Sequence, residues 1–209
     1  MNDPISGGRD AAAQEHSRRE AAGIPDRLLS RIDELTEKKK FVIIAIDGHC
    51  AAGKSTLAAM LKSVYSCNVF STDDFFLQPF QRTAERLAEP GGNFDRERFL
   101  DEVIQPLQTG NAFSYRAYNC QTQELTGAIT VTPNALNIVE GVYSLHPQFT
   151  DAYDIKVFLR IGPDEQSRRL LDRNPKMYDK FINEWIPMEN IYFNVFHISE
   201  ECDFVFSGG

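Results

Sequence analysis

The segment GHCAAGKS at positions 48–55 constrains the fold of this chain more than any other feature. It fits the pattern of a glycine, four further residues and then Gly-Lys-Ser or Gly-Lys-Thr, which is typical of a phosphate-binding loop. A short apolar stretch, Phe41–Ile46, precedes it and predicts a buried parallel strand, while good helix formers follow at Ser55–Lys62. A strand, a glycine-rich loop and a helix in this order place backbone N–H groups around a phosphate. The segment therefore predicts binding of a nucleoside triphosphate.

Two side chains of this loop have roles that the motif itself predicts. The ammonium group of Lys54 would reach the β- and γ-phosphates, and the Ser55 hydroxyl would bind Mg²⁺. The glycines allow the backbone amides to turn toward the anion, and His49 is interpreted as a filler at a permissive position. The predicted nucleotide site consists of Gly48, His49, Cys50, Ala51, Ala52, Gly53, Lys54, Ser55 and Thr56.

The remainder of the chain alternates short apolar stretches with helical patterns, which predicts a parallel sheet covered by helices on both faces. A helix is expected to begin near Asp26, with an apolar stripe from Leu28 to Leu35. The segment 112–131 differs, because its tyrosines and threonines surround Gly127 and predict a β-hairpin or small lid. We therefore predict an α/β fold of the P-loop NTPase type, in three layers, with a five-stranded parallel sheet. Its further strands are Asn68–Ser71, Leu136–Glu140, Ile155–Arg160 and Phe204–Phe206, and its further helices are Asp95–Leu107, Pro163–Arg173 and Met177–Phe196.

Length and charge limit the domain organisation and the partners. A chain of 209 residues suffices for one such domain, expected at 24–209 after a disordered tail at 1–23. The net charge of −8 argues against nucleic acid or an anionic membrane as a partner, and no apolar run is long enough to span a membrane. The four cysteines are scattered and indicate free thiols in the cytoplasm. The sequence leaves open a homo-oligomer.

Acidic residues follow two of the predicted strands. Asp73 and Asp74 come directly after one strand, and Glu140 ends another. Carboxylates at this edge of a parallel sheet suit the acceptance of a hydroxyl proton and the binding of Mg²⁺. The alternatives are a helix cap for the aspartates and an exposed surface position for Glu140.

Basic and aromatic residues supply the other candidates. One predicted helix carries three arginines, Arg168, Arg169 and Arg173. One or two of them are expected to reach the phosphates of ATP, and Arg169 and Arg173 are favoured. The others are expected to form ion pairs on the surface. Arg82 and Arg86 are most simply solvated helix charges; if they face the pocket, they indicate an acceptor that already carries a phosphate or carboxylate. Trp185, among apolar neighbours, is predicted to be core. An acceptor pocket is predicted around Asp74, Phe76, Asp95, Tyr115 and Arg116, with Phe94 as a further aromatic candidate.

At this point the chain resembles the uridine kinase and phosphoribulokinase group of P-loop small-molecule kinases, over about Lys40 to Phe206. The resemblance implies that Asp73 is the catalytic acid–base residue, that Glu140 helps to hold Mg²⁺ with Ser55 and Asp73, and that Arg169 and Arg173 belong to a lid over ATP. It also implies that Asp95 binds sugar hydroxyls and that Tyr115 lies near the base. Its landmarks, in order, are Ile46–Thr56, Ser71–Phe76, Asn93–Asp95, the hairpin from Tyr115, Val139–Gly141 and Asp154–Arg173.

The chain departs from this family in its acceptor region. The histidine expected after the hairpin tyrosine is absent from Arg116–Cys120, Phe76 replaces an aromatic hydroxyl, and the lid around Arg173–Lys176 is short. We therefore expect ATP, Mg²⁺ and a phosphoryl transfer to a hydroxyl of a small metabolite such as a nucleoside, with Lys54, Asp73, Arg169 and Arg173 as catalytic residues. The alternatives are a non-nucleoside acceptor, similar to pantothenate or a sugar phosphate, and a regulatory ATPase without a small acceptor.

Overall fold

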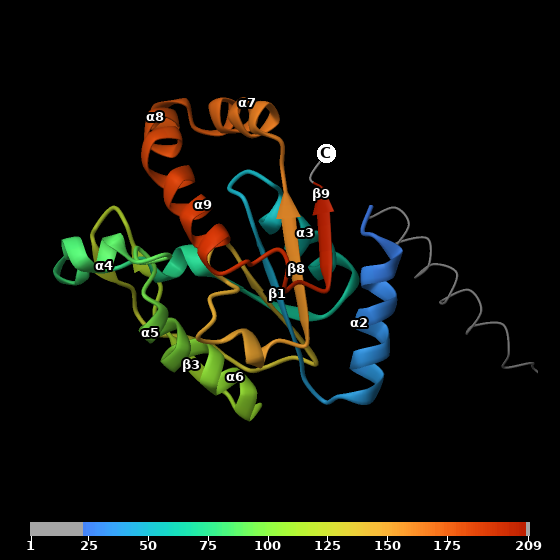
Figure 1. Cartoon of the computed structure of the whole chain (residues 1–209). Coiled ribbons are helices and arrows are strands. Elements are labelled where there is room, and N and C mark those ends of the chain that lie inside the picture. The colour runs from blue at the N-terminus through green and yellow to red at the C-terminus, as the bar shows by residue number, and fades with distance from the viewer. Residues whose placement is uncertain (1–22, 208–209) are drawn as a thin grey trace, which may run out of the picture.

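A computed structural model describes residues 23–207, so the tail expected at 1–23 lies outside the described residues except for Gly23. The centre of the molecule is a five-stranded parallel sheet in the order β2-β7-β1-β8-β9 (Figure 1). The expected α/β fold, with five parallel strands and helices on both faces, is confirmed. The strands are β1 Val42–Gly48, β2 Cys67–Ser71, β7 Leu136–Glu140, β8 Ile155–Arg160 and β9 Phe204–Ser207.

The register of the sheet brings the carboxyl ends of three strands together. In the ladder, Glu140 of β7 pairs with Ile46 of β1 on one side and with Ser71 of β2 on the other. Every residue of β1 is buried, as expected for the middle strand of a parallel sheet. The loop after β1 and the acids after β2 and β7 therefore start from the same edge.

Two hydrophobic clusters fill the spaces above and below the sheet. On one face, α2 (Asp26–Lys38) and α3 (Lys54–Val64) pack aliphatic side chains against β1, with Leu28 and Leu61 fully buried. On the other face, the cluster is aromatic and includes Phe70, Phe99 and Tyr192. The helix expected near Asp26 thus forms and buries the apolar stripe that its spacing predicts.

The segment after β2 begins with short helical turns and continues into a longer helix. The turns are η1 (Thr72–Phe75), η2 (Pro79–Gln81) and α4 (Ala84–Ala88). The helix expected at Asp95–Leu107 begins with Asp95 as its cap and runs to Thr109, through α5 (Arg96–Phe99), the π-turn η3 (Leu100–Ile104) and α6 (Gln105–Thr109).

The second helical segment follows β8, which is preceded by the turn η4 (Thr150–Ala152). Helix α7 has the expected bounds, Pro163–Arg173, and the helix expected at Met177–Phe196 runs from Pro175 to Val195. Each π-turn ends two residues before a proline, Pro106 or Pro187, which has no N–H for the helical ladder, and this is the physical reason for the irregularity. The components are η5 (Pro175–Met177), α8 (Tyr178–Lys180), η6 (Phe181–Trp185) and α9 (Ile186–Val195).

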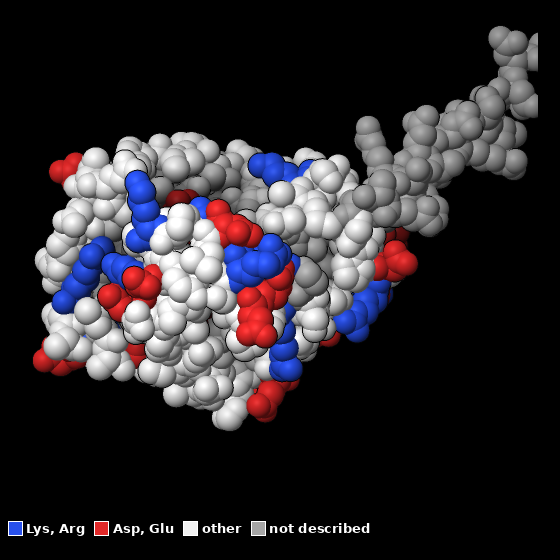
Figure 2. All heavy atoms as spheres, turned by 90° about the horizontal axis from the view of Figure 1, so that it is seen from above, with Lys and Arg blue, Asp and Glu red and all other residues white. Residues whose placement is uncertain are grey.

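The hairpin expected at 112–131 forms, but it is divided into two short ladders. β3 (Phe113–Tyr115) pairs with β6 (Ile129–Val131), and β4 (Tyr118–Asn119) pairs with β5 (Glu124–Leu125), both antiparallel. No helix within residues 23–207 is long and apolar enough to cross a membrane. Viewed from above, toward α7, the surface carries basic and acidic side chains next to one another (Figure 2).

Candidate active site

The loop between β1 and α3 adopts a conformation that only glycine allows at its first position. Gly48 has a φ of 138°, and a Cβ atom there would lie 2.1 Å from the carbonyl oxygen of Leu159 in β8. Gly53, with a φ of 100°, is the N-cap of α3. The loop is therefore pressed against the neighbouring strand while its far end opens α3 with free backbone amides.

Lys54 is held over the loop by the backbone of the loop itself. Its ammonium donates hydrogen bonds to the carbonyl oxygens of Gly48, at 2.8 Å, and His49, at 2.9 Å, and the side chain is buried. The imidazole of His49 points away, packing edge-on against Phe158 and Phe193 with an unpartnered Nδ1 atom among the described residues. Lys54 is thus placed where a phosphate on the loop would meet a positive charge.

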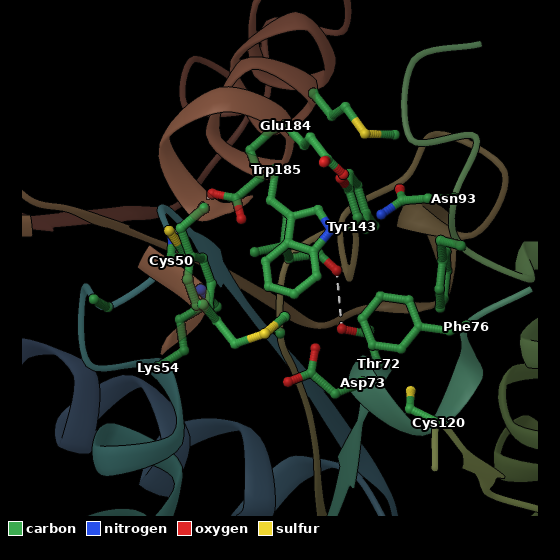
Figure 3. Close-up of a pocket in the computed structure, with 18 of the residues that line it drawn as sticks. Cys50, Lys54, Thr72, Asp73, Phe76, Asn93, Cys120, Tyr143, Glu184 and Trp185 are labelled. Carbon is green, nitrogen blue, oxygen red and sulfur yellow. Dashed lines mark hydrogen bonds between the residues drawn. The ribbon is translucent and has the colours of Figure 1, made fainter. Parts of the chain in front are cut away.

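A cavity of about 950 Å³ opens beside this loop, between the ends of β2 and β7 and the helices α7 to α9 (Figure 3). Six of the predicted nucleotide-binding residues line it: Cys50, Ala51, Gly53, Lys54, Ser55 and Thr56. Gly48, His49 and Ala52 do not. Of the other predicted site residues, the cavity is lined by Asp73, Phe76, Glu140, Arg169 and Arg173, and also by Phe94, the further aromatic candidate.

Ser55, Glu140 and Asp73 form the polar end of the cavity. The Ser55 hydroxyl donates a hydrogen bond to Glu140 Oε2 at 3.1 Å. Burial raises the pKa of Glu140, hydrogen bonds from hydroxyls lower it, and the negative charge of Asp73 raises it further. Gly141 follows with a φ of 129°, and a Cβ atom there would lie 1.9 Å from Thr72 Oγ1. These oxygens suit Mg²⁺, which binds proteins through one or two carboxylates and takes its remaining ligands from phosphates and water. Residues 23–207 contain no group of three or more acidic, histidine or cysteine side chains placed to hold a metal ion.

The arginines of α7 divide between the surface and the cavity. Arg168 pairs with Glu165 and Asp172 on the exposed face. Arg169 donates from Nη1 to the carbonyl oxygen of Ala51 in the loop at 3.2 Å and also pairs with Glu165. Arg173 lines the cavity with its guanidinium 5.9 Å from the centre of the Phe181 ring. The two arginines that the sequence favours thus lie at the cavity, and the third forms the surface ion pairs expected of such a helix.

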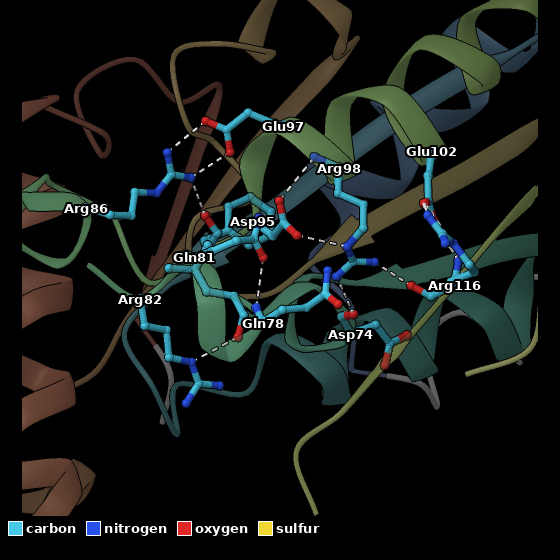
Figure 4. A network of polar contacts seen from close by, with 12 residues as sticks. Asp74, Gln78, Gln81, Arg82, Arg86, Asp95, Glu97, Arg98, Glu102 and Arg116 are labelled. Carbon is cyan, nitrogen blue, oxygen red and sulfur yellow. Dashed lines mark hydrogen bonds and ion pairs between the residues drawn. The ribbon is translucent and has the colours of Figure 1, made fainter. Parts of the chain in front are cut away.

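Four of the five predicted acceptor residues do not line this cavity. Figure 4 shows three of them, Asp74, Asp95 and Arg116, in a network of polar contacts. Asp95 caps α5 and forms a buried ion pair with Arg98, at 3.0 Å between Oδ2 and Nε. Arg116 pairs with Glu102, and Tyr115 packs against Phe70 and Phe75 in the aromatic cluster. The remaining one, Asp74, is half-buried, and burial raises the pKa of its carboxyl. In the structure, Asp95 is therefore a helix cap and Tyr115 is part of the aromatic core.

The structure adds cavity residues that the sequence did not nominate. Trp185, expected in the core, lines the cavity, with Lys180 Nζ 5.1 Å from its ring centre. Asn93 and Tyr143 line it as well. Arg82, interpreted from the sequence as a solvated helix charge unless it faces the pocket, also lines the cavity. A spacing signal existed for one helix face, since Phe181, Trp185, Met188 and Glu189 follow one another at helical intervals and all line the cavity.

Glu189 is the most unusual of these residues. Its Oε2 accepts a hydrogen bond from the backbone N–H of Cys50 in the loop, at 3.0 Å. Burial raises the pKa of Glu189 to about 7, although the charge of Lys54 lowers it. Beneath the loop, burial raises the pKa of Asp47 to about 6, against hydrogen bonds from the N–H groups of Leu145 and Gly48. Burial also raises the pKa of the Cys50 thiol to about 12, which disfavours its thiolate form. The positive charge of Lys54 lowers the pKa of both buried carboxyl groups, Asp47 and Glu189.

No model of a known protein family matches the chain. Among solved structures, a proposed uridine kinase from Bacillus stearothermophilus superposes with a TM-score of 0.63 and 22% identity, covering 86% of this chain and 99% of that one. A proposed fructose transport system kinase from Silicibacter sp. TM1040 gives 0.61 and 20% identity, covering 88% and 100%. A Saccharomyces cerevisiae protein, described as a proposed P-loop kinase with a circular permutation, gives 0.64 and 12% identity, covering 92% and 99%. The chain therefore has the fold of these P-loop kinases.

Proposed function

We propose that this chain, built on the P-loop kinase fold, is an ATP-dependent phosphotransferase related to the uridine kinase and phosphoribulokinase group. It moves the γ-phosphoryl group of ATP to a hydroxyl group of a small metabolite. One observation carries the proposal: Lys54, Ser55, Glu140 and Asp73 meet in one cavity that extends beyond them, so that there is space for an acceptor next to the phosphate loop. A regulatory ATPase needs the loop but not this additional space.

The nucleotide is held by the loop and the residues around it. The backbone amides at the start of α3 bind phosphate oxygens, and Lys54 exchanges its contacts with loop carbonyls for contacts with the β- and γ-phosphates. Ser55 and Glu140 would hold Mg²⁺, with Asp73 beside them. Mg²⁺ held by these residues would supply positive charge against the phosphates.

Asp73 is the residue that acts on the acceptor. It follows β2 at the same sheet edge as Glu140 and lines the cavity, so its carboxylate can orient the acceptor hydroxyl and take its proton. Arg169 and Arg173, which reach the cavity from α7, stabilise the negative charge on the transferring group.

The test replaces Asp73 with asparagine, which keeps the shape of the side chain and removes its basicity. ADP release with ATP and Mg²⁺ is measured across a panel of nucleosides, vitamins, sugars and sugar phosphates. We expect Asp73→Asn to lower acceptor-dependent turnover by about 10²- to 10⁴-fold while the Kd for ATP changes only a few-fold. The matched control is Asp74→Asn, because Asp74 is the adjacent carboxylate and lies outside the cavity. Loss of ATP binding in Asp73→Asn, or full acceptor-dependent turnover, would refute the assigned role.

A further inference from the structure

Five cationic side chains line the cavity, and three of them belong to its nucleotide end. Lys54 and Arg169 bond to carbonyl oxygens of the phosphate loop, and Arg173 lies one helical turn beyond Arg169 on α7. The other two, Arg82 and Lys180, come from the segment after η2 and from the end of α8. Within the described residues, the hydrogen bonds and ring contacts of this second pair are with Leu77, Tyr118 and Trp185 and not with the phosphate loop.

Arg82 and Lys180 lie on the acceptor side, near the hairpin. Arg82 donates from Nη2 to the hydroxyl of Tyr118 in β4 at 3.1 Å, and Cys120 directly follows that strand. The charges of both Arg82 and Lys180 lower the pKa of the Cys120 thiol, and the charge of Asp73 raises it, against a larger increase caused by burial. Figure 3 shows Cys120 beside Asp73. The two cations therefore share one region with the proposed catalytic carboxylate.

Neither cation is neutralised by the described part of the protein. Arg82 donates hydrogen bonds only to neutral oxygens: from Nε to the carbonyl oxygen of Leu77, at 3.0 Å, and to the hydroxyl of Tyr118. Within residues 23–207, neither Arg82 nor Lys180 forms an ion pair with a carboxylate. In contrast, Arg86, four residues further on, forms a two-pronged ion pair with Glu97. Figure 4 shows Arg82 directed away from the network that contains the Arg86 pair. The neutral partners of Arg82 orient its guanidinium group and leave its positive charge available to bind an anion.

The space between these cations and Asp73 suits a small hydroxylated molecule. Phe76 and Trp185 provide apolar surface, and Asn93 and Tyr143 add polar side chains to the lining. We propose that the acceptor is a hydroxylated small molecule carrying a phosphate or carboxylate, which Arg82 and Lys180 bind while a hydroxyl faces Asp73. This inference rests on the proposed function and names its substrate class.

The experiment compares neutral and anionic members of matched pairs. The pairs are ribose and ribose 5-phosphate, glycerol and glycerate, and panthenol and pantothenate, so that phosphate and carboxylate are tested separately. Binding is measured by calorimetry on the full chain loaded with Mg²⁺ and a non-hydrolysable ATP analogue, which occupies the phosphate loop. We expect the anionic member of at least one pair to bind about tenfold or more tightly than its neutral partner, as for charge-assisted hydrogen bonds. Equal affinity, or no binding, in all three pairs overturns the inference.

Variants locate the effect within the cavity. Arg82→Met and Lys180→Met should each reduce the advantage of the anion about tenfold and raise the KM of the acceptor, with the KM for ATP within twofold. Lys180 is exposed, so its variant tests the inference even if the loss of the Tyr118 contact disturbs the fold in Arg82→Met. The control is Lys176→Met, which removes an exposed lysine of the same lid segment that does not line the cavity. An anion advantage that persists in both variants overturns the assignment to these residues.

The same data separate this inference from the proposed function. Tight binding of an anionic member without any ADP release in its presence would refute the kinase proposal and leave the anion site standing. Phosphorylation of neutral acceptors alone, lost in Asp73→Asn, would support the kinase and refute the anion site.

Discussion

Replacing Glu189 with glutamine should stabilise the protein in a pH-dependent way. The side chain is buried, and this burial raises the pKa of its carboxyl from 4.5 to about 7. At 1.36 kcal/mol per pKa unit, ionising Glu189 in the folded state costs about 3 kcal/mol more than in the unfolded chain. Because the folded pKa lies above the unfolded one, the contribution of the carboxyl is complete below about pH 4.5 and is lost as the pH rises through about 7.

Glutamine keeps an oxygen for the Cys50 N–H and removes the titration, but it introduces an NH₂ group that costs about 1 kcal/mol if unpaired. The net gain from Glu189→Gln should therefore be about 2 kcal/mol at pH 8 and close to zero or slightly negative at pH 5. For a domain of this size, each kcal/mol moves the thermal midpoint by about 2–4 °C. Calorimetric unfolding of both proteins at pH 5 and pH 8 measures the difference.

The matched control is Glu184→Gln, which makes the same substitution at an exposed carboxylate five residues earlier on the same helical segment. Asp47, whose pKa is raised to about 6, titrates in both proteins and mainly cancels in the comparison. A stability difference between wild type and Glu189→Gln that is the same at pH 5 and pH 8 would refute the reasoning. It would mean that water or a structural adjustment relieves the burial of this carboxylate.

Two further substitutions test the foundations of the loop. Gly48→Ala should lower the free energy of unfolding by about 2–5 kcal/mol, because the added Cβ would lie 2.1 Å from the Leu159 oxygen at a φ of 138°. The control is Gly162→Ala, where a Cβ meets open space, and its denaturant midpoint should show almost no loss. Equal effects of the two substitutions would contradict the strain argument. Tyr192→Phe removes the hydroxyl that donates to Asp47 Oδ2 at 2.8 Å and should cost about 1–3 kcal/mol. Since the pKa of Asp47 is about 6, this loss should be larger at pH 8 than at pH 5, and urea titrations showing the opposite order would exclude a charge-assisted bond.

The sheet and the nucleotide end of the cavity could be predicted because their signals are local. The apolar stretch before Gly48 and the bounds of α7 depend on nearest neighbours along the chain, and both appear in the structure as expected. The position of Glu140 followed from a general rule, that acids ending parallel strands gather at one edge. These residues needed no knowledge of how distant segments pack.

The acceptor end of the cavity could not be predicted in this way, because the direction in which each side chain points depends on how the loops and helices outside the sheet pack. Asp95 forms an ion pair with Arg98 within one helical turn, and the spacing of three residues is as compatible with this pair as with ligand binding. Trp185 lies in an apolar run and was assigned to the core, but the π-turn of η6 and the path of α9 place it at the cavity. Arg82 and Arg86 look alike in sequence, and only the location of Glu97 separates them.

The order of the sheet has an evolutionary consequence. Residues proposed to handle ATP sit at the ends of β1, β2 and β7, the three adjacent strands of one hydrogen-bonded ladder, whereas Arg82 and Lys180 sit on short segments outside the five-stranded sheet. Mutations in those segments leave the strand register untouched, so preference for one metabolite over another can diverge among descendants without rebuilding the phosphate machinery. Grafting the segment after β2, or α8, from one such enzyme to another is accordingly a direct route to engineering a new acceptor.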